Sequence, residues 1–245
     1  MLEATRTVRE YALKIPAATR IFEKLGIDYC CGGGTSLSDA CVKAGVTVDE
    51  VLDSLERTQC SEEKIAGEEW QAASDAALVA HIVETHHEFT RDELVRLEAL
   101  LAKVCVVHGQ NHPELFHIQS QFQELRRDLE PHMLKEEQVL FPYIIRIEES
   151  IAKEQSPPVP PFGTVRNPVR MMMTEHDAAG EILRTMREAS SDYTTPPDGC
   201  ISFQTLYTAL TALEADLHQH IHLENNILFP RAAEREDTAR SLVKQ

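Results

Sequence analysis

Two segments of the chain carry the same spacing of side chains that can bind a metal. HMLKEEQVLFP occupies residues 132–142, and HIHLENNILFP occupies residues 220–230. Each has Glu four residues after its first His and ends in Leu-Phe-Pro. Residues four apart share one face of a helix, so each segment would direct an imidazole and a carboxylate to the same point. Such mixed nitrogen and oxygen donors suit iron, zinc or manganese. The two pairs are His132 with Glu136 and His220 with Glu224.

A further His precedes each segment at nearly the same distance. His87 lies 45 residues before His132, and His176 lies 44 residues before His220. Each half of the repeat is therefore expected to be a helix with one His, a connection and a helix with His-x-x-x-Glu. Two such hairpins make a four-helix bundle, whose core can gather side chains around metals. Six ligands exceed what one zinc ion needs and suit two metals bridged by the two carboxylates. The predicted ligands are His87, His132, Glu136, His176, His220 and Glu224.

The first of these ligands has one alternative. His86 and His87 are adjacent, and on an α-helix they differ by about 100° around the axis, so only one of them is expected to face the core. Leu94 follows His87 by seven residues, as Leu183 follows His176, which places both leucines on the buried side of matching helices. This match favours His87 as the ligand and leaves His86 as the alternative.

The composition favours an all-α protein. Of the 245 residues, 26% are charged and 6% are aromatic, and little of the chain alternates in the β pattern. The net charge of −16 disfavours binding to nucleic acid or to an anionic membrane surface. The sequence shows no apolar run near the roughly 20 residues that span a bilayer, and its first residues lack the apolar core of a signal peptide. We therefore expect a cytoplasmic protein whose six cysteines are thiols.

The pattern of helix signals predicts two domains. Residues 1–57 contain several capping signals and are expected to form a small domain of four short helices. Residues 58–72 are polar and charged and are expected to be a linker. Residues 73–245 are expected to form an up-down four-helix bundle. Pro131 and Pro142, both within its second helix, should interrupt or widen the helical turns. The bundle helices are expected at about 74–107, 114–151, 168–190 and 200–234.

A glycine-rich turn in the N-terminal domain carries two adjacent cysteines. Cys30 and Cys31 lie in the segment DYCCGGG, residues 28–34. Adjacent cysteines are not easily joined to each other, because their Cα atoms are only about 3.8 Å apart. Glycines let the backbone approach a ligand, and the helix that begins after Ser36 should lower the pKa of a nearby thiol. The turn therefore indicates thiol chemistry or metal handling, and a plain turn with incidental cysteines is the alternative.

Together these motifs resemble a known family. The bundle is similar to hemerythrin-like proteins, and the whole chain resembles the repair-of-iron-centres proteins, in which a small domain with a Cys-Cys-Gly motif precedes a di-iron hemerythrin-like domain. The matching segments are GIDYCCGGGTSL, HHEFTRDEL, KVCVVHGQNHPEL, TEHDAAGE and both His-x-x-x-Glu segments, which span nearly the whole chain. The resemblance implies that the six predicted ligands bind two non-haem iron ions, bridged by oxo and carboxylate groups. It also implies that Cys30 and Cys31 belong to a functional loop.

The resemblance leaves three functions open. The first is repair of iron–sulfur clusters damaged by nitrosative or oxidative stress, by supplying iron to damaged or apo iron–sulfur proteins. The second is reduction of nitric oxide at the di-iron centre, and the third is reversible binding or sensing of oxygen or nitric oxide. Cys30 and Cys31 would hold iron on its way out in the first function and pass electrons in the second. We also expect a homodimer formed through the N-terminal domain.

Overall fold

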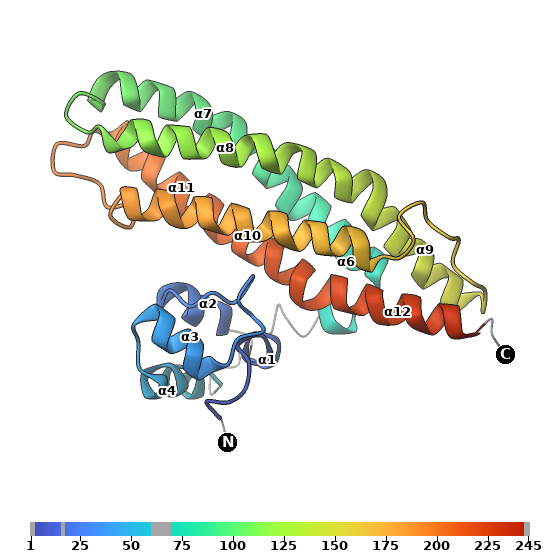
Figure 1. Cartoon of the computed structure of the whole chain (residues 1–245). Coiled ribbons are helices and arrows are strands. Elements are labelled where there is room, and N and C mark those ends of the chain that lie inside the picture. The colour runs from blue at the N-terminus through green and yellow to red at the C-terminus, as the bar shows by residue number, and fades with distance from the viewer. Residues whose placement is uncertain (1–2, 16–17, 60–69, 243–245) are drawn as a thin grey trace.

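The computed structural model describes residues 3–15, 18–59 and 70–242. Within these residues the regular secondary structure is helical, apart from one isolated bridge between Thr7 and Ser36. Figure 1 shows long helices side by side in an elongated bundle, with a group of short helices beside it. The prediction of an all-α fold is confirmed.

Four short helices form the N-terminal unit, and their capping residues explain where they begin. Thr7 accepts a hydrogen bond from the N–H of Glu10, and the Glu10 carboxylate accepts one from the N–H of Thr7, which completes a capping box. Ser36 accepts from the N–H of Asp39 at the start of the third helix. Gly45 ends that helix with φ of 71°, a left-handed conformation that glycine adopts without strain. The helices are α1 (Val8–Lys14), α2 (Ala18–Lys24), α3 (Leu37–Ala44) and α4 (Val48–Gln59).

The connection between the two units is described only at its ends. α4 continues to Gln59, two residues beyond the domain end expected at residue 57. Of the expected linker, residues 60–69 lie outside the described residues. Trp70, immediately after them, stacks on His81 of the bundle with 4.2 Å between the ring centres. The aromatic contact therefore attaches residue 70 to the first bundle helix.

The bundle consists of four long helical runs, three of which change type part-way. The first run is α6 (Asp75–His81), η1 (Ile82–His87) and α7 (Glu88–His108), and the second is α8 (Glu114–Lys135), η2 (Glu136–Leu140) and α9 (Phe141–Ala152). The third run is α10 (Arg166–Ala189), and the fourth is α11 (Ile201–Leu223), η3 (Glu224–Leu228) and α12 (Phe229–Leu242). The three η segments are π-helical. In each, a hydrogen bond spans five residues, so the turn holds one residue more than an α turn.

The sequence predicted a distorted helix at both Pro131 and Pro142, and the prediction is wrong for Pro131. α8 continues through Pro131, which stays exposed, and nothing in the structure explains why proline stands there. The widened turn is instead η2, which ends just before Phe141 and Pro142. Proline has no N–H, so it suits a place where the α pattern of hydrogen bonds is already displaced. η3 precedes Pro230 in the same way.

The metal-binding region lies between two apolar parts of the bundle core. One apolar cluster extends from Leu94 to Val104 in α7 and includes Leu183 in α10 and Leu213 in α11. The other includes Leu78 in α6, Phe141 in α9 and facing residues of α10 and α12. The predicted ligands lie where the two clusters meet along the helices. Leu94 and Leu183 are both buried, as the repeat predicted.

The N-terminal unit packs against the fourth run of the bundle. Ile221 of α11 belongs to the apolar core of the small domain. Gln219 donates a hydrogen bond to the Tyr29 hydroxyl at 2.9 Å, and Glu23 of α2 pairs with His218 at 3.0 Å. The turn that carries the two cysteines is therefore held against α11. Within the described ranges, the helices lack the combination of length and apolarity needed to cross a membrane.

Candidate metal centre

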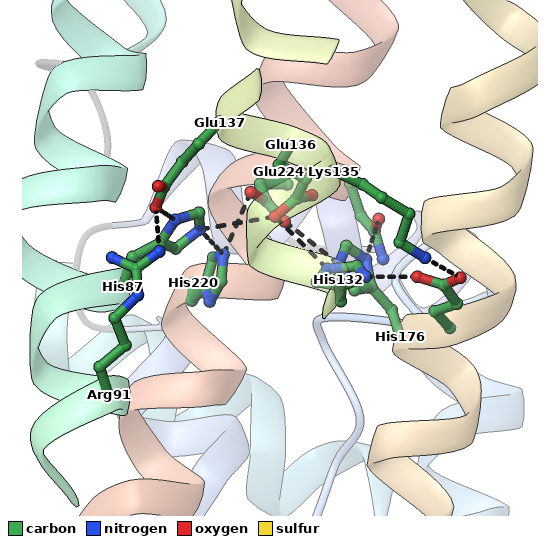
Figure 2. Close-up of polar contacts among 11 residues, drawn as sticks. His87, Arg91, His132, Lys135, Glu136, Glu137, His176, His220 and Glu224 are labelled. Atoms are coloured by element: carbon green, nitrogen blue, oxygen red, sulfur yellow. Dashed lines mark hydrogen bonds and ion pairs between the residues drawn. The ribbon is translucent and has the colours of Figure 1, made fainter. Parts of the chain in front are cut away.

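Two buried groups of histidine and glutamate lie in the middle of the bundle and share both of their carboxylates. The His87 cluster consists of His87, Glu136, His220 and Glu224, and the His132 cluster consists of His132, Glu136, His176 and Glu224. In each cluster the potential ligand atoms all lie within 4.8 Å of one another. Figure 2 shows the two carboxylates between the two pairs of imidazoles. The structure thus brings together all six residues selected from the sequence.

All four runs of the bundle contribute to this arrangement, and the π turns lie at its edge. His87 is the last residue of η1, whereas Glu136 and Glu224 are the first residues of η2 and η3. His132 and His220 stand one turn earlier, in α8 and α11, and His176 is in α10. The relative exposure of these six side chains is between 0% and 2%. The turns with an extra residue therefore coincide with the places where ligands enter the core.

In the His87 cluster, the Nε2 atoms of the two imidazoles point at each other and at the carboxylates. The distance between the Nε2 atoms of His87 and His220 is 3.2 Å. His87 Nε2 lies 3.5 Å from Glu136 Oε2, and His220 Nε2 lies 3.1 Å from Glu224 Oε1. Four potential ligand atoms from four residues therefore converge on one point.

The His132 cluster repeats this geometry. The Nε2 atoms of His132 and His176 are 3.0 Å apart. His132 Nε2 lies 3.4 Å from Glu136 Oε2, and His176 Nε2 lies 3.2 Å from Glu224 Oε2. Each carboxylate therefore faces one imidazole of each pair.

The outer Nδ1 atom of three of the imidazoles is held by an oxygen. The pairs are His87 with Glu137 at 2.6 Å, His132 with Glu175 at 2.7 Å and His176 with Asn225 at 2.9 Å. A carboxylate or amide oxygen only accepts hydrogen bonds, so Nδ1 carries the proton and Nε2 keeps a free lone pair directed into the cluster. Arg91 pairs with Glu137 at 2.6 Å, and Lys135 pairs with Glu175. These cations keep the two outer carboxylates ionised.

The electrostatics of the buried carboxylates fit bound cations. Burial, followed by the charge of Glu224, raises the pKa of Glu136 well above its usual value. Among the described residues, neither carboxylate has a hydrogen-bond donor for either of its oxygens. A buried carboxylate without a donor is costly unless a cation compensates it. Burial also lowers the pKa of His87 and of His132 to about 4, which keeps both imidazoles in the neutral form that binds metals. The donor set therefore suits two metal ions.

Known proteins share this combination of domains. Residues 78–232 match the hemerythrin HHE cation-binding domain, and residues 4–59 match ScdA_N, a domain of unknown function. A probable iron-sulfur cluster repair protein of Haemophilus influenzae is 33% identical over 228 residues, which cover 93% of this chain and 96% of the relative. The iron-sulfur cluster repair protein YtfE of Escherichia coli O81 is 34% identical over 223 residues, 91% of this chain and 94% of the relative. YtfE of Escherichia fergusonii gives the same identity and coverage.

The chain belongs to this family of iron–sulfur cluster repair proteins. The matches cover both domains, so they confirm the resemblance found in the sequence as well as the helical bundle. In this repair-family chain, His86 does not join either cluster. Its Nδ1 lies 2.9 Å from Asp216, and its ring is stacked on that of His220 with 5.8 Å between the centres.

The two adjacent thiols of this repair-family chain lie outside both clusters. The Sγ atoms of Cys30 and Cys31 are 3.9 Å apart, and together with Asp28 they make a smaller group of potential ligands. The hydrogen bond that the Cys30 thiol donates to Cys31, together with burial, raises the pKa of Cys30, so the expectation of a lowered pKa is wrong for this residue. The cause is position, because the thiol is buried in the apolar core that the small domain shares with Ile221 and donates to Asp28 and Cys31.

A cavity of about 430 Å³ opens between the thiol turn and the bundle. Cys30 and Cys31 line one side of it, and Asp177, Gly180 and Arg184 of α10 line the other. A Cβ atom on Gly180 would lie 4.0 Å from Cys31 Sγ, an ordinary van der Waals distance, so the thiol lies close to this part of α10. Gly180 stands one helical turn after the His176 ligand position. The thiols therefore approach the helix that carries one of the imidazoles.

Sequence reasoning missed the residues that hold the imidazoles from outside. Glu137 and Asn225 occupy equivalent positions, each directly after the Glu of its His-x-x-x-Glu segment. They bind the equivalent imidazoles His87 and His176. The repeat contains a sign of their role, because both residues are polar and stand at the same distance before the Leu-Phe-Pro end of their segments. It becomes visible only once helix packing shows which imidazole each one meets.

Proposed function

We propose that this chain binds two iron ions at the two clusters and supplies iron to damaged iron–sulfur proteins. The observation that carries the proposal is the pair of buried clusters that share Glu136 and Glu224. The two carboxylates would offset half of the charge of two divalent ions, and the four imidazoles would add ligands without adding negative charge, which suits ions that must later leave. Damaged or apo iron–sulfur proteins are the proposed partners, in keeping with the repair proteins of Haemophilus influenzae and Escherichia coli to which the chain is similar.

The chain's own residues would act in three ways. The four Nε2 atoms and the two carboxylates would bind the ions. Glu137, Glu175 and Asn225 would orient the imidazoles and fix which nitrogen is free, as partners outside the ligand set commonly do. The apolar residues on both sides of the clusters would exclude water, which strengthens the hold of charged ligands on the ions.

Metal analysis of the purified protein tests the first part of the proposal. We expect about two iron ions per chain, as in other bundles that carry paired carboxylates. The oxidised protein should show the charge-transfer absorption of an oxo-bridged pair. Zinc or manganese in place of iron, or a single ion per chain, would contradict the assignment.

The thiol turn provides the test of iron delivery. We propose that Cys30, Cys31 and Asp28 hold an ion briefly as it leaves, because their potential ligand atoms lie within 4.8 Å of one another beside α10. A Cys30→Ala, Cys31→Ala double variant should keep both irons and the parent spectrum. It should lose most transfer of iron to an apo iron–sulfur protein.

Cys200→Ala is the matched control, because Cys200 is an exposed thiol of the bundle outside the turn. It should transfer iron as the parent does. Nitric oxide consumption is measured on the same proteins. If the double variant transfers iron normally but consumes less nitric oxide, the thiols serve reduction and the delivery proposal is wrong. If it matches the parent in both assays, the turn has only a structural role.

A further inference from the structure

Two adjacent asparagines of η3 connect the N-terminal domain to the metal centre. Asn225 and Asn226 are 7% and 5% exposed, and they occupy the two positions after the predicted carboxylate ligand Glu224. Each makes a hydrogen bond to the backbone of the cysteine turn. Only Asn225 also contacts one of the six predicted ligands. The two residues therefore differ in one respect that matters for the metal.

Asn225 uses both ends of its amide. Its Oδ1 atom lies 2.9 Å from His176 Nδ1, and its Nδ2 atom donates a long hydrogen bond of 3.4 Å to the carbonyl oxygen of Cys30. The carbonyl can only accept, so it fixes which end of the amide is NH₂ and turns the oxygen toward His176. His176 must then donate from Nδ1, which leaves its Nε2 free for a metal.

The repeat shows that this position holds an imidazole in both halves of the bundle. Glu137 is the equivalent of Asn225, and it accepts from His87 Nδ1 at 2.6 Å. Its second partner is Arg91, within the bundle. A carboxylate could not donate to a carbonyl oxygen, whereas an amide can. The amide at position 225 can therefore bind both His176 and the Cys30 carbonyl of the N-terminal domain, which a carboxylate could not.

Asn226 is hydrogen-bonded to the same turn but not to any of the six predicted ligands. Its Nδ2 donates to the carbonyl oxygen of Tyr29 at 3.1 Å and, more weakly, to that of Cys30 at 3.4 Å. Its other contact is His222, which is not among the predicted ligands. A Cβ atom on Gly33 would lie 2.9 Å from Asn226 Oδ1, so the turn is tightly packed on this residue.

We propose that Asn225 is a positioning residue that couples the docking of the cysteine turn to the hold of His176 on its metal. When the turn is docked, the Cys30 carbonyl fixes the orientation of the Asn225 amide, and the amide fixes the orientation of the His176 imidazole. When the turn moves away to meet a partner, the amide is free to rotate and the His132 cluster holds its ion less firmly. The inference rests on the proposed metal binding and adds to it a link between partner contact and release.

Release of the bound metal to a chromogenic chelator measures the coupling. The parent's own metal content, determined first, tests the proposed function separately, and the release comparison uses the ion that the parent is found to bind. Asn225→Ala should keep the circular dichroism of the parent and release one ion about 10- to 100-fold faster. Release at the parent rate would overturn the proposal.

Asn226→Ala separates docking from positioning. It should make the buried Cys30 thiol accessible to a thiol reagent and speed release at least about twofold, the smallest effect expected of coupled residues. In the Asn225→Ala background the same substitution should add nothing, because the link is already cut. If it speeds release equally in both backgrounds, the turn acts on the metal by another route and Asn225 does not carry the coupling.

Asn225→Asp tests the acceptor role with almost no change of shape. The carboxylate can still accept from His176 but cannot donate to Cys30. Release should therefore stay as slow as in the parent and become insensitive to Asn226→Ala. If Asn225→Asp releases metal as fast as Asn225→Ala, acceptance from His176 is not what holds the ion, and the proposal is wrong.

Discussion

The two clusters contain the same kinds of ligand but support them differently. His132 and its cluster partner His176 both have their Nδ1 atoms bonded, to Glu175 and to Asn225. In the His87 cluster, His87 is held by Glu137, whereas His220 Nδ1 has no hydrogen-bond partner among the described residues. Supported imidazoles bind metals more tightly than unsupported ones. The two ions should therefore differ in how firmly they are held.

The difference comes from one position of the repeat. Glu175 precedes His176 and reaches across to His132. The equivalent residue before His87 is His86, which stacks on His220 but turns its Nδ1 to Asp216. A carboxylate in one half thus corresponds to an imidazole with a different partner in the other. The ligands follow the internal repeat, but the hydrogen bonds that support the imidazoles do not.

Removing a shared carboxylate should have the largest effect, because it belongs to both clusters. We expect Glu136→Leu and Glu224→Leu each to reduce the metal content to one ion or none. The metal-free variants should melt no lower than the metal-free parent, because a buried carboxylate without donors is replaced by an apolar side chain. Metal analysis and thermal denaturation test both statements. Gln138→Leu, at an exposed position of the same π turn, is the control, and two ions with an unchanged spectrum in both Glu variants would contradict the prediction.

The adjacent histidines should differ sharply in their effect on the less supported ion. His87→Ala removes a ligand of the His87 cluster and should cost one ion and change the absorption spectrum. His86→Ala removes only the ring that stacks on His220 and should leave two ions in place. The reverse result would mean that η1 is rotated by one residue relative to the structure.

Timed removal of metal by a chelator should show the asymmetry directly. We expect two phases in the parent, with the ion of the His87 cluster leaving first. Glu175→Gln weakens the support of His132 and should speed the slow phase about tenfold, which brings the two phases closer together. Glu137→Gln should instead speed the fast phase. A single phase in the parent, or the same response to both variants, would show that the supports are equivalent.

The last prediction concerns the thiol of Cys200, at the end of the bundle far from the metal centre. Cys200 Sγ lies 3.1 Å from His108 Nε2, and this hydrogen bond lowers the pKa of the exposed thiol from 9.0 to about 7. Because a lowered pKa favours the thiolate, alkylation of Cys200 should rise with pH to a midpoint near 7. His108→Ala should move that midpoint toward 9. Peptide-resolved mass spectrometry after timed alkylation measures it.

The same variant serves as a check on the metal centre. His108 ends α7, about 30 Å along the helix from His87. His108→Ala should therefore leave both phases of metal release unchanged. A change in either phase would mean that the difference between the two clusters is not local.

The ligand set could be found from the sequence because helix periodicity and an internal repeat determine it. His132 and Glu136 share a helix face whatever the helix packs against. The partners of the Nδ1 atoms could not be found in this way, since Glu175 reaches an imidazole of another helix. Nor could the docking of the cysteine turn on Asn226 be found, because that contact depends on how the N-terminal unit packs against the bundle.

The π turns were predicted only in part, since a widened turn was expected near Pro142, where η2 lies, but none was expected at η1 or η3. Periodicity arguments assume 3.6 residues in every turn, and one extra residue in η2 leaves the apolar pattern on either side intact. Pro142, which follows it, was a signal of irregular geometry. Pro230 stands at the matching place in the repeat and, read in the same way, would also have located η3. It could not have located η1, which has no proline after it.

The π turns also determine which one-residue changes of length this molecule can absorb. Losing one codon within an ordinary part of a bundle helix would rotate everything after it by about 100° and expose its apolar face. Losing one codon within η2 or η3 would instead let the turn relax to a regular α-helix, while the segment that follows keeps its packing. The fold would survive, but the side chains of that turn would point elsewhere. A single in-frame deletion at these places should therefore leave a folded bundle that no longer binds metal.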